Sequence, residues 1–442
     1  MRTTIHIYFY RALLLSVLMV TIAMPATAYD FMADSIAYSF NNNDSTTVSV
    51  VPISKTEYYK GDIVIPETVI YNGSSLTVTA IGKAAFAFCS EMTSISLPNS
   101  ITAISFCAFM NCYELTEITL PNQLKLLDDC AFVSCTGLKS IKIPDSVELI
   151  GYLAFNENHS LETVVLPNSL EVIDEMTFAN CWNLKNINFP ESLKYIKYEA
   201  FSGCDKLTDI NIPDSVVEVS SRAFAGCSKV KELRVGESVK RIANSAFIDC
   251  KWMEVLKWDA AECDDFDDID APFCLLFGKN FSIVIGNNVK RIPANLCRYS
   301  INLKSVDIPA SVNEIGKQAF DTCFHLKTIV SRIHAPSMVN YGTDIESIFN
   351  GVDKDSCVVF VPAGTIEAYK ATMPWSEFNH FEEIVENDIN CDMAVTSADV
   401  TMLYNQILNN DYSSPSTCDV NGDGVVNAAD ITAIYNTLLG NQ

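Results

Sequence analysis

Several features that mark common protein classes are scarce or missing in this chain of 442 residues. Lys and Arg number only 30 against 54 Asp and Glu, which gives a formal net charge of −24. A partner of nucleic acid or of an anionic membrane needs a basic surface, so we expect neither as a partner. After residue 28 no apolar run reaches the roughly 18 residues of a membrane span, so an integral membrane protein is not expected.

Motifs of metal and enzyme chemistry are missing as well. No two cysteines have C-x-x-C spacing, so a zinc site is not expected. The four histidines after residue 28 are isolated from one another: His159, His325, His334 and His380. Neither a G-x-S-x-G motif nor a phosphate-binding glycine loop occurs. A Cys–His protease is conceivable from composition, but the repeat described below accounts for the cysteines, and we expect no enzyme.

The first 28 residues have the three parts of a secretory signal peptide. Arg2 and Arg11 supply positive charge, residues 12–24 are almost entirely apolar, and Ala26-Thr27-Ala28 is a small-residue cleavage site. The alternative is a membrane anchor, but about 13 apolar residues are too few to span a bilayer. The sequence therefore predicts cleavage after Ala28 and a secreted, extracellular protein.

A repeat of 23 residues is the main feature that is present. One column of the repeat consists of phenylalanines: Phe86, Phe109, Phe132, Phe155, Phe178, Phe201, Phe224 and Phe247. Three positions later runs a second column: Cys89, Cys112, Cys135, Asn158, Cys181, Cys204, Cys227 and Cys250. The register breaks after Phe247 and returns with Cys297 in the Phe column and Phe320 one repeat later. The 50 residues between Phe247 and Cys297 fit two repeats and a four-residue insertion.

A fixed period of this length with several apolar columns predicts a solenoid in which each coil buries its face on the next. Within one repeat, residues 115–120 alternate as Leu-Thr-Glu-Ile-Thr-Leu, which indicates a short strand. Pro121 follows this strand and ends it, because its ring removes a hydrogen-bond donor. We therefore expect a β-rich, right-handed solenoid of the α/β class with about 11 repeats of 23 residues.

The repeat resembles the BspA-like leucine-rich repeats of bacterial surface and secreted proteins. The motif P-x-S-V-x-x-I-G-x-x-A-F-x-x-C-x-x-L carries the resemblance, and residues 143–151 match it almost in full. Residues 65–330 form the predicted repeats, residues 29–64 resemble the family's N-terminal β cap, and residues 331–386 resemble its closing module. The resemblance implies binding rather than catalysis, since family members are associated with adhesion to host proteins, other bacteria or glycans. The fold does not determine the ligand.

The C-terminal residues 387–442 contain two copies of a 12-residue acidic motif. Oxygen-bearing side chains stand at positions 1, 3, 5, 9 and 12, and position 7 offers a backbone carbonyl, which suits the six to eight hard ligands of calcium. The first predicted ligand set is Asp388, Asn390, Asp392, Ala394, Thr396 and Asp399. The second is Asp419, Asn421, Asp423, Val425, Asn427 and Asp430. A single motif could be a solvated acidic turn, but two copies in register, each followed by an amphipathic helical pattern, favour calcium loops.

This pair of motifs resembles a type I dockerin, a small all-α domain. The resemblance implies two Ca²⁺ ions, folding that depends on calcium, and a cohesin domain on another secreted protein as the partner. By the same resemblance the cohesin contacts are Ser397, Ala398, Tyr404, Ala428, Ala429 and Tyr435. Met393 replaces the preferred glycine of the first loop, so we expect the first loop to bind calcium more weakly than the second.

Other clusters have simpler interpretations. We expect the column cysteines, and Cys107 with Cys130 in a neighbouring column, to be stacked buried thiols rather than a chain of disulfides. Cys391 and Cys418 are better candidates for a disulfide. The acidic segment 262–270 is interpreted as a solvated loop that bulges from the solenoid, and as a plausible place for ligand specificity.

The predicted strand face gives a glycan ligand no direct support. Its exposed column contains no aromatic ring: Ser96, Thr119, Lys142, Val165, Asn188, Asn211, Arg234 and Lys257. The sequence therefore predicts a secreted, non-enzymatic adhesion protein whose repeats bind a protein or glycan and whose dockerin docks onto a cohesin in a cellulosome-like assembly. The alternatives are a spacer subunit without a specific ligand and, less favoured, an enzyme of polysaccharide degradation with its active site in residues 251–291.

Overall fold

The computed structural model describes residues 29–41, 44–54, 57–243, 245–266, 272–273, 280–385, 395–408, 420 and 426–439. The predicted signal peptide, residues 1–28, lies outside these described residues. The chain divides into two compact units, residues 1–167 and 168–442, and each is described by itself.

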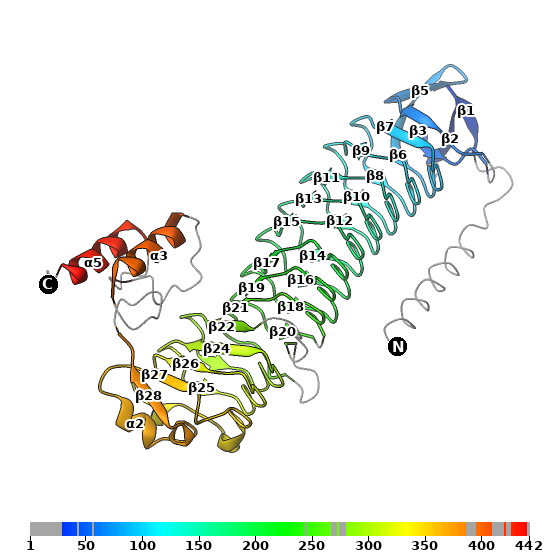
Figure 1. The fold of residues 1–442 in the computed structure, drawn as a ribbon. Helices are drawn as coiled ribbons and strands as arrows, with labels where there is room; N and C mark the ends of the chain where they lie inside the picture. Colours follow the sequence, from blue (N-terminus) through cyan, green and yellow to red (C-terminus); the bar gives the residue numbers. More distant parts are fainter. Residues whose placement is uncertain are drawn as a thin grey trace. The chain divides into compact units, whose positions relative to one another are not determined.

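The first unit starts with a β cap. Three strands pair antiparallel in succession: β1 (Phe31–Ala33), β2 (Ile36–Asn41) and β3 (Asp44–Val51). β3 then pairs in parallel with β6 (Ser74–Ile81), which also forms a hairpin with β5 (Thr68–Tyr71). The parallel pairing continues from β6 through a stack of two-residue strands: β8 (Ala103–Ile104), β10 (Leu126–Leu127) and β12 (Leu149–Ile150). The cap therefore leads directly into the solenoid (Figure 1).

A second row of parallel strands runs along the first unit. It comprises β4 (Gly61–Val64), β7 (Met92–Ser96) and β9 (Glu117–Ile118), followed by the pair β11 (Ser140–Lys142) and β13 (Thr163–Val165). After β4, the paired residues lie one repeat apart: Ile95 pairs with Ile118, and Ile141 pairs with Val164. The period of 23 residues in the sequence is thus the register of the sheet.

The second unit repeats this arrangement. Its longer row is a parallel sheet of β17 (Asp209–Asn211), β19 (Glu232–Val235), β21 (Val255–Trp258), β22 (Phe281–Ile285), β24 (Leu303–Ile308), β26 (Thr328–Ser331), β27 (Val358–Val361) and β28 (His380–Glu383). β15 (Asn186–Asn188) precedes this row. The other row comprises β14 (Val172–Ile173), β16 (Tyr195–Ile196), β18 (Glu218–Val219) and β20 (Arg241–Ile242), and then the pair β23 (Arg291–Ile292) and β25 (Glu314–Ile315). The β-rich leucine-rich-repeat solenoid is therefore confirmed.

Short helices accompany the last strands of this unit. They are η1 (Pro336–Met338), η2 (Ile345–Ser347), α2 (Ile366–Lys370) and η3 (Trp375–Glu377). Tyr369 of α2 and Trp375 of η3 are fully buried, and their rings lie 5.3 Å apart. These two side chains close the apolar core at the end of the sheet.

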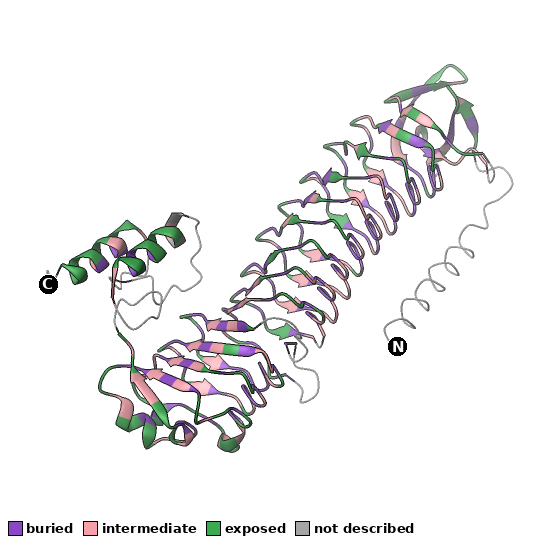
Figure 2. Ribbon diagram, in the orientation of Figure 1, coloured by how far each residue is buried: buried purple, intermediate pink, exposed green. Residues whose placement is uncertain are grey.

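The phenylalanine column forms the centre of the core in each unit. In the first unit Phe86, Phe109, Phe132 and Phe155 are fully buried, and successive centroids lie 5.3, 4.9 and 5.3 Å apart. In the second unit the column continues through Phe247 to Phe273 at 5.6 Å. Phe273 therefore occupies a repeat of its own between Phe247 and Cys297, which confirms that two repeats fit this interval. Figure 2 shows that buried residues alternate with exposed ones around the coils.

The cysteine column has a hydrogen-bonding role that the sequence interpretation did not identify. Five buried thiols of this column donate to a carbonyl of the preceding coil, as Cys135 does to Phe109 at 3.0 Å and Cys227 to Phe201 at 3.3 Å; the others are Cys112, Cys204 and Cys250. Asn158 takes the same place with its Nδ2 donating to the Phe132 carbonyl at 2.8 Å. All cysteines of the described residues are free, as predicted for the column, and Cys274, Cys391 and Cys418 lie outside them.

Candidate calcium-loop and docking site

Two amphipathic helices form the C-terminal module. α3 (Ser397–Leu408) and α5 (Ala428–Leu438) meet through Val400, Leu403 and Ile434, which are buried. Five partly buried apolar residues surround this cluster: Val395, Ile407, Val420, Val426 and Ile431. The spacing of these residues places one apolar stripe on each helix, so burial of the two stripes against each other holds the module together.

Each helix begins with the same hydrogen-bonded arrangement. The Asp430 carboxylate accepts from the backbone N–H of Asn427 at 2.7 Å, and the Asn427 side-chain oxygen accepts from the Ala429 N–H at 2.7 Å. This is a capping box, in which side chains satisfy N–H groups that a helix start leaves unpaired. Thr396 and Asp399 repeat the arrangement at α3, with the Thr396 N–H donating to Asp399 at 2.7 Å. Positions 9 and 12 of the predicted loops are therefore brought together in both copies.

These positions suit a hard cation. Both Asp399 and Asp430 have no exposed surface, although an ionised carboxylate is costly to bury without a compensating charge or hydrogen bonds. Each carboxylate lies beside a second oxygen atom that can bind a metal ion. This atom is the Thr396 hydroxyl oxygen for Asp399 and the Asn427 amide oxygen for Asp430. Carboxylate, hydroxyl and amide oxygens are the ligand types that calcium accepts. The described part of each loop thus fits a calcium ion.

The other predicted ligands cannot be placed in this way. Eight of them lie outside the described residues: Asp388, Asn390, Asp392, Ala394, Asp419, Asn421, Asp423 and Val425. The two sets therefore remain predictions from the sequence, supported at positions 9 and 12 by the geometry of the helix starts.

The predicted cohesin contacts are all at the surface. Ser397, Ala398, Ala428 and Ala429 are at least partly exposed in the first turns of the helices. Tyr404 and Tyr435 are 51% and 50% exposed at equivalent positions of α3 and α5. Sequence reasoning did not include three further exposed apolar side chains in this surface: Met402 of α3, Leu438 at the end of α5 and Leu439 directly after it. Met402 lies between the buried residues Val400 and Leu403 on another face of α3, which was the signal that could have identified it; Leu438 continues the stripe of Ile434 and is exposed because it stands at the end of α5.

The strand face of the second unit is already charge-paired within the chain. Arg234 lies 2.7 Å from both Asp214 and Asp259, and Lys257 pairs with Glu232. Burial lowers the pKa of Arg234, but Asp259 and Asp214 outweigh this effect and the net pKa is raised. Burial raises the pKa of the Asp259 carboxyl despite its contact with Arg234. Arg234 and Lys257 are therefore engaged in ion pairs within the protein, and a ligand on this face would have to compete with those pairs.

Exposed aromatic rings lie outside the strand column. Trp182, Trp252, Tyr299 and Phe324 of the second unit are each more than two-fifths exposed, and Tyr113 is similar in the first. Three of them, Tyr113, Trp182 and Phe324, stand four residues after a column Phe. Inspection of all the repeat columns, rather than the strand column alone, would have found this set.

The acidic segment is attached more firmly than the prediction of a solvated bulge implied. The Asp265 side chain accepts from the Ala294 N–H at 2.7 Å and pairs with Arg291. The Asp264 N–H donates to the Lys240 carbonyl at 2.8 Å. Meanwhile β21 and β22 pair in register across the insertion, so the longer strand row passes through it intact. Residues 267–270 of the segment lie outside the described residues.

Comparisons with known proteins identify two regions. The BspA type Leucine rich repeat region matches residues 72–181, 150–260 and 277–342, in 6 copies. The Dockerin type I domain matches residues 386–439. No curated protein matches the chain.

Several solved structures are similar to the chain. A leucine-rich repeat protein from Bacteroides ovatus is 26% identical over 81% of this chain and 100% of its own, with a TM-score of 0.45. A leucine rich cell surface protein from Faecalibacterium prausnitzii is 22% identical over 77% and 96%, with a TM-score of 0.43. The leucine-rich repeat protein of T. pallidum is 28% identical over 45% and 90%, with a TM-score of 0.40. Within the described ranges, no helix has both the length and the apolar character needed to cross a membrane.

Proposed function

Because the chain belongs to the BspA-type leucine-rich repeat family and carries a type I dockerin domain, we propose that it is a secreted, non-enzymatic protein with two binding surfaces. Both regions are binding modules rather than catalytic ones, which supports this assignment. The signal-peptide pattern of residues 1–28 supports secretion.

In this proposal each loop of the C-terminal module holds one Ca²⁺ ion. The observation that carries it is the pair of fully buried carboxylates, Asp399 and Asp430, at equivalent helix starts. Bound calcium supplies positive charge that offsets the repulsion among the acidic ligands of each loop. Thr396 and Asn427 orient the carboxylates through the hydrogen bonds at the helix starts.

Calorimetric titration of the full chain with calcium, after treatment with EGTA, tests this part. We expect two binding events, of which Asp430→Ala removes the tighter and Asp399→Ala the weaker. Loss of a main ligand should weaken the affected site at least about tenfold. Asp249→Ala, an acidic residue of the solenoid surface, is the matched control and should change neither event. A chain that binds no calcium would contradict the proposal.

The same module is proposed to dock onto a cohesin domain in an extracellular assembly. Tyr404 and Tyr435 present half-exposed rings on α3 and α5, and aromatic residues of this kind commonly anchor protein interfaces. The small residues in the first turn of each helix let a partner approach the backbone closely. The pairwise equivalence of the two helices supports a surface that either copy can present.

The solenoid is proposed to bind a protein or glycan of a host, a bacterium or a substrate. The second candidate, a spacer with no specific ligand, is favoured by the ion pairs that already engage Arg234 and Lys257. Pull-down with a chain in which Asp399→Ala and Asp430→Ala disable the module separates the two. Specific and saturable retention of one component supports ligand binding, and consistent absence of retention supports the spacer.

A further inference from the structure

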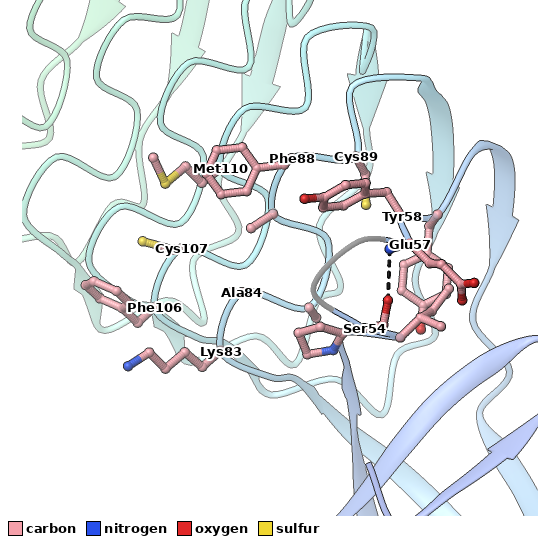
Figure 3. A pocket seen from close by; sticks show the side chains of 15 residues that line it. Ser54, Glu57, Tyr58, Lys83, Ala84, Phe88, Cys89, Phe106, Cys107 and Met110 are labelled. Atoms are coloured by element: carbon pink, nitrogen blue, oxygen red, sulfur yellow. Dashed lines mark hydrogen bonds between the residues drawn. The ribbon is translucent and has the colours of Figure 1, made fainter. Parts of the chain in front are cut away.

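The first unit contains a cavity between its cap and its first two coils. Its volume is about 130 Å³, and its walls come from residues 52–54 and 57–59, from the turn at 83–89 and from the turn at 106–110 (Figure 3). An apolar cavity of roughly 150 Å³ is large enough to accept a benzene molecule. The space therefore suits a single aromatic ring.

The walls are apolar and already ordered. Tyr59 is held on one side, because its hydroxyl accepts from the Ala37 N–H at 3.0 Å and donates to the Val51 carbonyl at 3.1 Å. On the other side the Phe88 N–H donates to the Met110 carbonyl at 2.7 Å, so its backbone donor is in use. A ligand inside the cavity thus meets mainly apolar side chains, and the hydrogen bonds of Tyr59 and Phe88 hold these walls in place before it binds.

At one wall of the cavity the first coil has a smaller residue than the next two coils have at the equivalent positions. Ala87 follows the column residue Phe86, and the equivalent positions of the next two coils hold Met110 and Val133. Ala87 lines the cavity and is buried. The backbone at this position therefore accepts a larger side chain in the same fold, and a larger side chain at Ala87 would fill the space.

One rim of the cavity carries a positive charge. The Lys83 ammonium lies 5.1 Å from the centre of the Phe106 ring, and among the described residues no ion pair includes it. Glu57 lies on the other side of the opening (Figure 3). If a ligand extends an acidic group out of the cavity on the Lys83 side, that group can form an ion pair with Lys83 and lies on the side away from Glu57.

We propose that this cavity binds the ring of a small aromatic monocarboxylate, and that Lys83 pairs with the carboxylate. The site is separate from both docking surfaces proposed above, so neither proposal depends on the other. Such a ligand differs in size and chemistry from a protein or glycan bound along the strand face.

Titration of the full chain with 3-phenylpropionate and with the neutral 3-phenylpropionamide tests the site. We expect saturable binding of the acid below about 10 mM, and about three- to fivefold weaker binding of the amide. Lys83→Met should weaken the acid to the level of the amide and leave the amide unchanged. Glu57→Gln should not weaken the acid, and Lys125→Met, at a surface ion pair elsewhere in the unit, should change nothing.

Ala87→Met tests the location, since it introduces the residue of the next coil. It should weaken both ligands more than tenfold, and Ala87→Val, which introduces the residue of the third coil, should have a smaller effect. Thermal unfolding establishes that each variant folds. If Ala87→Met does not fold, Ala87→Val is used for the test in its place. Unchanged binding by the folded filling variants, or equal binding of acid and amide, would overturn the proposal.

Discussion

The thiol column allows a quantitative test of why cysteine recurs in this repeat. Cys227 has no exposed surface, and its sulfur lies 3.3 Å from the Phe201 carbonyl. Cys227→Ala removes this hydrogen bond, at about 1 kcal/mol, and the buried sulfur with its small cavity, at about another 1 kcal/mol. Cys227→Ser keeps a donor, as Ser300 does in the same column, where its hydroxyl lies 3.1 Å from the Phe273 carbonyl. We therefore expect losses of about 2 kcal/mol for alanine and about 1 kcal/mol for serine.

Cys263 supplies the matched control, because it is buried and its thiol has no hydrogen-bond partner among the described residues. There the order should reverse, since serine would bury a hydroxyl without a partner while alanine would not. Urea unfolding followed by tryptophan fluorescence measures the free energies, and hydrogen exchange around residues 201–227 locates the effect. If the Cys227→Ala variant has the same free energy of unfolding as Cys227→Ser, the thiols contribute only apolar packing and the hydrogen-bonding argument is wrong.

Three further predictions concern the stability of the fold. Burial raises the pKa of the Cys250 thiol to about 12 from 9.0, so the thiol ionises at a lower pH in the unfolded chain than in the folded one. The free energy of unfolding should therefore fall as the pH rises from about 9 towards 12. Urea unfolding measured across that range should show the loss, and constant stability would contradict the prediction. Phe201→Ala, between Phe178 and Phe224 at 5.4 and 5.2 Å, should lower the free energy of unfolding by about 3–5 kcal/mol in the same urea assay, and a loss below about 1 kcal/mol would refute a continuous aromatic core. Arg298→Met leaves the buried Asp321 carboxylate without its cation, 3.1 Å away, and should lower the free energy of unfolding by about 3 kcal/mol in the urea assay; a loss below about 1 kcal/mol would contradict a structural role for this ion pair.

The sequence was sufficient to predict the solenoid because its period is also the register of its sheet. Residues 23 positions apart, such as Leu126 and Leu149, must occupy equivalent places once coils stack. The two repeats expected between Phe247 and Cys297 are present, but Phe273 lies 26 residues after Phe247, so the strict period did not predict its place. In a regular repeat, the contacts between neighbouring coils thus follow directly from the spacing of the residues in the sequence.

Other features depended on distances that the repeat does not specify. The thiol-to-carbonyl bonds could have been suspected, because Asn158 and Ser300 replace cysteine with other donors. The anchoring of Asp265 could not, since Arg291 lies 26 residues away across an irregular insertion. The cavity beside Ala87 likewise depends on how closely the cap approaches the first coil. In the C-terminal module, the pattern T-x-x-D at Thr396 and N-x-x-D at Asn427 already indicated the capping arrangement.

Binding of the full chain to immobilised type I cohesins, measured with calcium and with EGTA, tests the proposed function most directly. We predict saturable binding to at least one cohesin in calcium, none in EGTA, and loss of binding when Asp399→Ala and Asp430→Ala are combined. The double variant Tyr404→Ala, Tyr435→Ala should bind calcium as the original chain does but bind the cohesin at least about tenfold more weakly. Binding that persists unchanged in EGTA, or in the combined aspartate variant, would contradict a calcium-dependent dockerin.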